Sequence, residues 1–522
     1  MPLNIISFVG IFALCAIAWF FSERRDLKYF PWRVVIWGIV LQLILGFLVF
    51  WFPPTKFILN AFSQLLNSVF AATDVGANFV FGHVLVPTPL NPPRNPIDPL
   101  LGPLAGIFAF RVLPAVIFFG GLMSLLYNIG VIQPVVNFFA KIFYAFMRLS
   151  GAESLSGAAN IFVGIEAAIV VKPFLPKMTR SELCAILACC FGTAASSTLA
   201  IYVGALRDVF PNILVHLVSA SIIAIPACFV LSKILVPETE IPLTAGGIPA
   251  EETVVERDEY GVSKETVGGE VIERVSPVDA AILGTIDGMK MAVTIAAVLI
   301  FIVGFVSLIN QLFQGLAGLQ TSEILVLQPI GQFFSVVTLE NILGALFLPL
   351  TVLTGVSLDW NELWISSVLI GSRLLKTAIP SYIQLGQLAG QGAMSDRAIL
   401  IISYALSGFA HLASVGIFVG GTIALIPSRR KDISELGWKA LFIGTLATIM
   451  ISCVAGVFDT GDPSILGEPP AQTAPAAAPA SPNPAATTVP APTTTTAPAP
   501  TATTVPAPAA TTAPAPTVSP TP

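Results

Sequence analysis

Glu166 is a single acidic residue inside an apolar stretch of the chain, which reads NIFVGIEAAIVVKPF over residues 160–174. A charged side chain at the centre of a bilayer costs about 2.5–3.5 kcal/mol even on lenient insertion scales. Such a residue therefore needs an ionic partner or a water-filled cavity. Two interpretations stay open: Glu166 faces a wet cavity and accepts hydrogen bonds from a polar solute, or it pairs with Lys172 and locks the fold.

Small and hydroxyl-bearing residues interrupt two further apolar stretches. The first reads FGTAASSTLAIY over 191–202, and the second reads ISYALSGFAHLASVGIFVGG over 402–421. Each follows a broken apolar segment, so a broken segment and a weakened helix occur together twice, at corresponding places in two halves of the chain. This pairing is typical of the substrate site of a secondary transporter, although packed helices with small-residue contacts also contain Gly and Ser.

The composition explains why these polar positions stand out. The chain has 522 residues, of which 55% are hydrophobic and 11% are charged, with a mean hydropathy of +0.85. Soluble domains carry roughly 25% charged residues, so we expect a membrane protein with several spans.

The sequence contains no basic stripe of the kind that would indicate binding to nucleic acid. The six cysteines show no metal-ligand spacing, and neither a phosphate-binding loop nor a nucleophile–base pair is visible, so we expect neither an enzyme nor an ATP-driven pump.

Apolar stretches that approach the roughly 20 residues needed to cross a bilayer recur along the chain. They lie at 4–21, 33–52, 104–129, 182–205, 212–236, 279–312, 398–426 and 438–458. Other apolar stretches contain Pro, Gly, Ser and charged residues, and we predict interfacial helices and re-entrant hairpins there. They lie at 55–82, 131–174 and 322–390.

Lys and Arg gather in three clusters, and positive loops stay in the cytoplasm. With the N-terminus outside, eight crossings place all three clusters inside and the C-terminus on the outer or periplasmic side. The clusters are Arg24, Arg25, Lys28 and Arg33; Lys141, Arg148, Lys172, Lys177 and Arg180; and Arg429, Arg430, Lys431 and Lys439. We therefore predict a multi-pass protein of the plasma or inner membrane.

Two segments are too polar to belong to the membrane part. The loop 237–277 holds ten acidic residues and is predicted to be a solvated cytoplasmic linker. From 464 to 522 the chain consists mainly of Ala, Pro and Thr, with repeats such as ATTVPAP, and such a composition predicts a disordered tail.

Several long motifs, in this order, resemble the concentrative nucleoside transporter family, and the similarity covers most of 1–460. They are FAFRVLPAVIFFGGLMSLLYNIGV (108–131), AESLSGAANIFVG (152–164), PFLPKMTRSEL (173–183), ISYALSGFAHLASVGIFVGG (402–421) and RRKDISELGWKALFIGTLATIM (429–450).

The resemblance implies an all-α membrane fold with eight transmembrane helices and two re-entrant helical hairpins in an inverted repeat, together with interfacial helices. It implies a homotrimer that imports nucleosides with Na⁺ or H⁺ and needs no other cofactor. We expect N-terminal transmembrane and scaffold helices in 1–130, then an interfacial helix, the first hairpin and the following helices in 131–236. After the linker, 278–460 should hold a scaffold helix, the second hairpin and the C-terminal helices.

The resemblance also assigns the site residues. For the coupling cation it implies side-chain oxygens from Asn160 and Thr193 and backbone carbonyls from Val163 and Ala194. For the substrate it implies Glu166, Ile165, Phe409, His411 and Ser414.

The substrate motifs depart from the family pattern. The family has Gly-Gln-Thr-Glu-Ala-Pro where this chain has Gly164-Ile-Glu-Ala-Ala168, and Ala378 replaces a ribose-binding acid. Another small polar metabolite as substrate, or a membrane sensor without transport, therefore stays open as an alternative. His411 replaces an asparagine, and it is either a hydrogen-bonded packing residue or a group that reads the substrate or titrates as a proton coupler.

Overall fold

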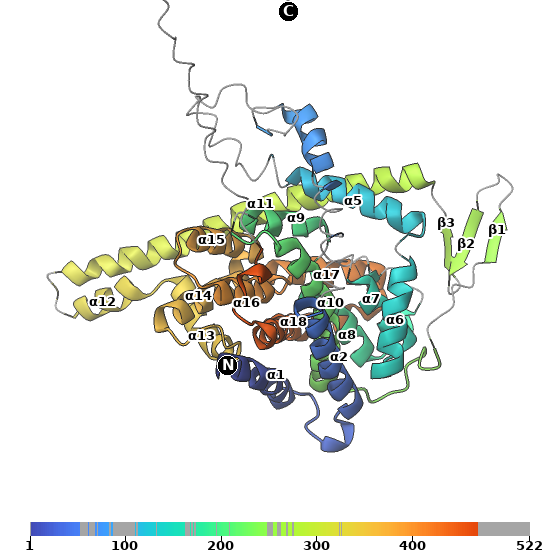
Figure 1. Ribbon diagram of the computed structural model, residues 1–522, viewed down its shortest axis with the longest axis horizontal. Helices are drawn as coiled ribbons and strands as arrows, with labels where there is room; N and C mark the ends of the chain where they lie inside the picture. Colours follow the sequence, from blue (N-terminus) through green and yellow to red (C-terminus); the bar gives the residue numbers. More distant parts are fainter. Residues whose placement is uncertain are drawn as a thin grey trace, which may run out of the picture. The chain divides into compact units, whose positions relative to one another are not determined.

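The chain is described by a computed structural model, drawn as a ribbon in Figure 1. The described residues are 2–52, 61, 68–69, 71–82, 85–86, 110, 113–131, 133–161, 167–168, 171, 174–194, 196–207, 209–247, 254–257, 263–267, 270–273, 276–322, 324 and 326–467. Three predicted site residues, Val163, Ile165 and Glu166, lie outside them, as does the tail from 468 onward.

Helices α1 (Pro2–Phe20) and α2 (Trp32–Phe50) form the N-terminal pair. Each has 19 residues, and at about 1.5 Å per residue each nearly matches a bilayer core of about 30 Å. Helix α1 packs against α18, and α2 packs against α10. A 3-10 turn (Leu27–Tyr29) joins the pair, and Asp26 caps this turn by accepting a hydrogen bond from the Lys28 N–H at 3.1 Å.

Helix α11 (Pro277–Ala317) has 41 residues and packs along α5 (Leu113–Asn128), as the upper part of Figure 1 shows. Glycine permits the close contact. A Cβ atom added to Gly120 would lie 2.6 Å from the Gly284 carbonyl oxygen, and one added to Gly288 would lie 2.8 Å from the Val116 carbonyl oxygen. Small residues at such contacts are a common means of helix association in membranes, because lipid provides no hydrophobic driving force between helices.

The first half of the chain continues with a short half-crossing helix and a broken helix. Helix α6 (Gln133–Met147) precedes α7 (Gly151–Ala159), whose nine residues extend about 14 Å, which is half of a bilayer core. After a 3-10 turn (Leu175–Lys177) come α8 (Arg180–Gly192) and α9 (Ser196–Leu206), the two parts of the broken helix, and then the long, buried α10 (Ile213–Leu235).

The second half repeats this order. A 3-10 turn (Gly318–Thr321), α12 (Gln328–Val336) and α13 (Leu339–Leu353) come first. Helices α14 (Trp360–Lys376) and α15 (Ala378–Gly390) pack against each other as a hairpin. The broken helix follows as α16 (Asp396–Leu406) and α17 (Leu412–Leu425), and α18 (Arg430–Phe458) is the long helix, with 3-10 turns at Pro427–Arg429 and Pro463–Ile465.

The predicted all-α membrane fold is confirmed by this arrangement. Among the described residues, four helices are long and apolar enough to cross a membrane, namely α1, α2, α10 and the helical segment that includes α18. A fifth span results if α12 and α13, which are bent by 64° at their junction, count as one. The total of eight transmembrane helices stays a prediction.

The acidic segment 237–277, predicted to be a solvated linker, contains three short strands. They are β1 (Val254–Arg257), β2 (Ser263–Val267) and β3 (Glu270–Glu273), and they pair antiparallel in the order β1-β2-β3. Val254 lies opposite Thr266, and Lys264 lies opposite Glu273. The β-branched residues of VVER and EVIE were the signal in the sequence that favoured strands. The prediction of a linker relied instead on the number of acidic residues.

The basic clusters of the sequence meet at one end of the helices. Glu23, which follows α1, forms ion pairs with Arg180 at the start of α8 and with Lys439 near the start of α18. Arg429 donates a hydrogen bond to the Met178 carbonyl at 2.9 Å, just before α8. This is the arrangement that the positive-inside rule requires of a cytoplasmic end.

The opposite end holds the start of the second broken helix. Arg397, at the beginning of α16, forms an ion pair with Asp459 at 2.8 Å, and Asp459 directly follows α18. The Asn4 side chain donates to the Asp459 carbonyl at 2.7 Å, which adds the start of α1 to this end. Helices α8 and α16 therefore begin at opposite ends, as an inverted repeat requires.

A buried polar network holds α7, α8 and α10 together at the end where the basic clusters meet. Lys233 of α10 lies 2.5 Å from the Glu153 carboxylate of α7 and donates to the Ser181 hydroxyl of α8 at 3.1 Å. Ser150 caps α7, and its hydroxyl donates to Glu182 of α8 at 2.6 Å. The side chains of Lys233 and Glu153 are only 5% and 1% exposed. Lys233 also pairs with the less buried Glu238 at 3.2 Å, so it is the Glu153 charge that depends on Lys233.

We predict that Lys233→Met destabilises the protein by about 3–5 kcal/mol, because it leaves the Glu153 carboxylate buried without its counter-charge. The readout is the thermal denaturation midpoint of the purified protein. Lys290→Met is the matched control, since Lys290 and Asp287 form an exposed pair of the kind that contributes about 0–1 kcal/mol. Equal midpoints for both variants would contradict a structural role for the buried pair.

Candidate functional site

The first broken helix is interrupted at Thr193, between α8 and α9. Thr193 has extended backbone angles, φ −113° and ψ 166°, and its hydroxyl donates to the Cys189 carbonyl at 2.8 Å. Thr193 and Ala194 are both 1% exposed. The interruption therefore places backbone and hydroxyl oxygens in the protein interior, where α8 can no longer satisfy all of them.

The second broken helix is interrupted between Ser407 and His411. The Ser407 hydroxyl donates to the Tyr404 carbonyl at 2.8 Å and closes the end of α16. His411 is the N-cap of α17, and its Nδ1 accepts a hydrogen bond from the Ser414 N–H at 3.3 Å. His411 and Ser414 are 6% and 1% exposed.

The two interruptions contact each other directly. The Phe409 N–H donates to the Thr193 carbonyl at 3.2 Å. A Cβ atom added to Gly408 would lie 2.8 Å from the Gly192 carbonyl oxygen and 2.9 Å from the Phe191 carbonyl oxygen, so only glycine fits at this crossing. The ends of α8 and α16, which begin on opposite sides of the membrane part, therefore meet in its interior.

The depth of Asn160 and Thr193 within the membrane part follows from where α7 and α8 begin. The Ser150–Glu182 hydrogen bond places the beginnings of α7 and α8 at one level, and the two helices pack against each other. Asn160 lies ten residues beyond Ser150 and Thr193 lies eleven residues beyond Glu182, so each is about 15 Å along its helix, which is half of a bilayer core.

The side-chain amide oxygen of Asn160 has no hydrogen-bond partner among the described residues. The residue is fully buried at the end of α7, and its amide nitrogen donates to the Ser156 carbonyl at 3.2 Å. Within the described part of the chain its Oδ1 accepts no hydrogen bond. A buried amide oxygen without a donor is costly unless a donor or a cation completes it, and hard cations prefer oxygen ligands of this type.

Arg373 of α14 is a buried charge near the end of the first helix of the second hairpin. Its side chain is buried, it donates one hydrogen bond to the Ala405 carbonyl near the end of α16, and a second reaches the Thr448 hydroxyl at 3.0 Å. No acidic partner is found for it among the residues that the structure describes. Carbonyl groups at a helix C-terminus carry partial negative charge, so they compensate the guanidinium in place of a carboxylate.

Thr377 forms the tip of the second hairpin. The sequence analysis did not predict it as a site residue. It has φ +68°, it is 6% exposed, and its hydroxyl has no hydrogen-bond partner in the described chain. A β-branched residue at positive φ is strained, and such strain is found mainly at ligand sites and switches. Its place directly before Ala378, where the family motif has an acid, was the only available signal.

Lys376, which precedes this tip, is engaged elsewhere. Its ammonium group forms an ion pair with Glu340 of α13 at 2.5 Å. Glu340 also accepts a hydrogen bond from Asn310 of α11 at 2.8 Å. Lys376 therefore ties the second hairpin to α11 and α13 and does not replace the missing acid at position 378.

Three of the predicted substrate residues lie together at the start of α17. The rings of Phe409 and His411 have centroids 6.1 Å apart and are nearly perpendicular, at 86°. The Ser414 hydroxyl lies 3.1 Å from the His411 Nδ1. Because Nδ1 accepts the Ser414 N–H, an imidazolium at this position would lose the cap, and the geometry favours the hydrogen-bonded packing role over proton coupling.

The structure describes six of the nine predicted site residues, and a hydrogen bond joins the two interruptions to which five of them belong. Asn160 lies at the end of α7, which packs against α8. Asn160, Thr193 and Ala194 belong to the first half, Phe409, His411 and Ser414 belong to the second, and the hydrogen bond runs from Phe409 to Thr193.

Comparisons with known protein families match most of the chain. The family model described as Na⁺ dependent nucleoside transporter N-terminus matches residues 9–84, and the one described as the C-terminus matches 216–456. A model described as nucleoside recognition matches the intervening residues 109–208.

Curated relatives match over nearly the same range. An uncharacterized transporter of Haemophilus influenzae is 32% identical over 87% of this chain and 97% of its own length. The putative nucleoside permease NupX of Escherichia coli is 30% identical over 87% of this chain and 98% of its own length. Solute carrier family 28 member 3 of Mus musculus is 30% identical over 87% of this chain, which spans 59% of that longer protein.

Solved structures of the transporter CNTnw are also similar. An inward-facing, substrate-bound state has a TM-score of 0.72 at 32% identity and covers 87% of this chain and 98% of the other. A variant in an outward-facing state has a TM-score of 0.73 at 32% identity, with coverage of 88% and 98%.

We predict that Gly408→Ala destabilises the protein by about 1–3 kcal/mol, the usual cost of overpacking a close contact, and abolishes function by separating the two interruptions. Gly416→Ala is the control, because a Cβ atom there meets no atom within 4 Å, and in a helix Ala is favoured over Gly by about 1 kcal/mol. Thermal denaturation and solute uptake are measured for both. A Gly408→Ala protein with normal uptake would show that the crossing does not position the site.

Proposed function

Because the chain belongs to the Na⁺-dependent nucleoside transporter family, we propose that it couples the entry of a cation to the uptake of nucleosides across the membrane. The observation that carries the proposal is the meeting of two interrupted helices at half-depth, together with a buried Asn160 oxygen that has no hydrogen-bond partner in the described chain. Interrupted helices that start from opposite sides are the usual basis of a site with alternating access.

The cation site belongs to the first half of the chain. Asn160 contributes its free Oδ1, Thr193 its hydroxyl oxygen, and Val163 and Ala194 their backbone carbonyls. These neutral oxygens suit Na⁺ better than a proton, since none of them titrates near neutral pH. In the second half the buried Arg373 guanidinium already supplies a positive charge near the end of α16, so we propose one exchangeable cation per protomer.

The proposed substrate site combines residues of both hairpins with the start of α17. Glu166 accepts hydrogen bonds from the nucleoside, Ile165 and Phe409 provide apolar contact, and Ser414 and His411 form the polar wall at the start of α17. Ala378 stands where the family has an acid that binds the ribose. The neighbouring Thr377 hydroxyl, which has no hydrogen-bond partner in the described chain, provides a shorter polar group in place of that acid. Fewer charged contacts to the ribose predict weaker binding than in a site with both acids.

Assembly and orientation complete the proposal. The chain forms a homotrimer in the plasma or inner membrane, each protomer with its own site. Both termini lie on the outer or periplasmic side. The gathering of Arg180, Arg429 and Lys439 at one end of the helices supports this orientation.

We predict that the purified protein in sealed liposomes accumulates labelled nucleoside only when a sodium gradient points inward. Uptake with equal sodium on both sides, or with a choline gradient, should fall to the level of empty liposomes. Nucleoside binding without accumulation would favour a membrane sensor, and the absence of both would refute the nucleoside assignment.

Glu166→Gln tests the carboxylate within the same assay. The substitution keeps the side-chain size and removes the charge, so uptake efficiency should fall roughly 10–100-fold, given that a hydrogen bond to a charged group contributes about 1.5–3 kcal/mol. Glu435→Gln is its control, since the Glu435 side chain is 55% exposed at the cytoplasmic end.

We predict that Asn160→Ala raises the sodium concentration for half-maximal uptake by roughly 10–100-fold, because an ion–dipole contact of about 1.5–3 kcal/mol is lost. Gln42→Ala is the matched control: Gln42 of α2 is also fully buried, its amide oxygen has no hydrogen-bond partner among the described residues, and it lies outside the site. An equal loss of sodium affinity in both variants would mean that Asn160 acts only through stability.

A further inference from the structure

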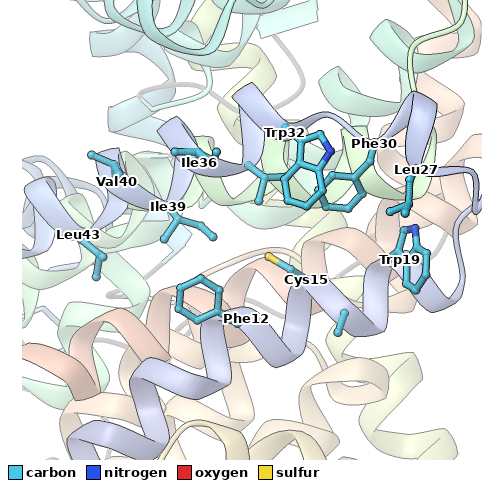
Figure 2. A pocket seen from close by; sticks show the side chains of 12 residues that line it. Phe12, Cys15, Trp19, Leu27, Phe30, Trp32, Ile36, Ile39, Val40 and Leu43 are labelled. Atoms are coloured by element: carbon cyan, nitrogen blue, oxygen red, sulfur yellow. The ribbon is translucent and has the colours of Figure 1, made fainter.

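A groove with no place in the transport site runs between α1 and α2. Figure 2 shows its side chains directed toward each other from the two helices. Its volume is about 560 Å³, and its lining is almost entirely apolar, with Phe12, Trp19, Ile36 and Leu43 among the residues. This volume lies within the range of about 300–1,000 Å³ that small-molecule sites occupy.

One end of the groove is closed by the turn that joins the two helices. Leu27 and Phe30 of this turn line the groove, and Arg24, Arg25 and Lys28 lie on the same turn with exposed side chains. The Arg25 guanidinium lies 5.1 Å from the centroid of Phe20, and Arg24 lies 5.2 Å from that of Tyr29. Three cationic groups therefore stand at the end of an apolar channel.

The acidic residues of the turn do not neutralise these groups. Glu23 is bound to Lys439 and Arg180. Partial burial raises the pKa of its carboxyl, but the hydrogen bonds from Lys439 and Arg180 lower this pKa by more than burial raises it. The net pKa therefore lies below the ordinary value, and Glu23 stays ionised and paired with Lys439 and Arg180. Asp26 accepts the Lys28 backbone N–H as the cap of the turn. Within the described chain, no ion pair engages Arg24, Arg25 or Lys28.

We propose that the α1–α2 groove binds one acyl chain of an anionic phospholipid whose phosphate lies against Arg24, Arg25 and Lys28. The apolar lining matches a hydrocarbon chain, and the cationic end matches an anionic headgroup. Lys and Arg beside a cytoplasmic helix end attract anionic lipid by about 1 kcal/mol each. The groove opens to the bilayer, since Phe12 is 48% exposed and Trp32 is 58% exposed on its rim.

Native mass spectrometry of the full-length protein in mild detergent tests the headgroup part of the proposal. Dioleoylphosphatidylglycerol is the anionic probe and dioleoylphosphatidylcholine the neutral one. We expect one phosphatidylglycerol per protomer to be retained under conditions that remove phosphatidylcholine. The triple variant R24Q/R25Q/K28Q should weaken this binding on the order of 100-fold. R430Q/K431Q removes two exposed charges elsewhere at the cytoplasmic end and should leave the binding unchanged.

Ala16→Trp tests the acyl-chain part. Ala16 lines the groove and is exposed, so the indole fills the groove without disturbing the core, and retention of phosphatidylglycerol should be lost. Ile5→Trp is the control, on the same helix at a residue that is 64% exposed and outside the groove. Equal retention of both lipids, or unchanged retention in Ala16→Trp, overturns the proposal. A change of oligomeric mass in Ala16→Trp with lipid retention intact would instead assign the groove to a second copy of the chain.

Discussion

The structure depends on the contact between two interrupted helices in the middle of the membrane part. A membrane leaves no water to satisfy free backbone groups, so an interrupted helix persists only where other groups complete it. Here the Phe409 N–H completes the Thr193 carbonyl, and Gly408 permits the approach because a side chain would collide with the end of α8. The same contact that satisfies the backbone also places polar groups from both halves of the chain at one point.

The two halves have the same order of elements but treat charge differently. In the second half, Arg373 brings a permanent cation to the carbonyl groups at the end of α16. In the first half, Asn160 and Thr193 offer neutral oxygens at the end of α7 and α8, and the Asn160 Oδ1 has no partner in the described chain. The second half thus carries a buried cation of its own, whereas we propose that the first half accepts a cation from solution.

Buried and interfacial charges fix the ends of the helices, and this leaves the middle free for function. The Lys233–Glu153 pair and the Ser150–Glu182 hydrogen bond anchor the starts of α7 and α8 on one side, and Arg397 with Asp459 anchors the start of α16 on the other. The turn between α1 and α2 belongs to the first of these sides and contributes Glu23 to its ion pairs, whereas Arg24, Arg25 and Lys28 form no ion pair in the described chain. These three charges are the ones for which we propose a lipid partner.

The sequence by itself determined the class of protein. Its hydropathy predicted a membrane protein with several spans, and the two Gly- and Ser-rich interruptions indicated a secondary transporter, because the cost of polar groups in lipid limits where they can occur. The all-α fold with two hairpins followed from the resemblance of the motifs to the family. The charge of the segment 237–277 was also plain, although its strands were not, since short β-branched runs carry a weak signal.

Only the tertiary structure decided which polar residues have an ion-pair or hydrogen-bond partner and which have none in the described chain. Lys376 is adjacent to the hairpin tip in sequence but pairs with Glu340, and His411 caps α17. In the described chain, Arg373 is buried without an ion-pair partner, and the buried Thr377 hydroxyl has no hydrogen-bond partner. These outcomes depend on contacts between residues far apart in the chain. Local pattern shows that a polar residue needs a partner, but the partner itself is supplied by another helix, and its identity is fixed only when the helices pack.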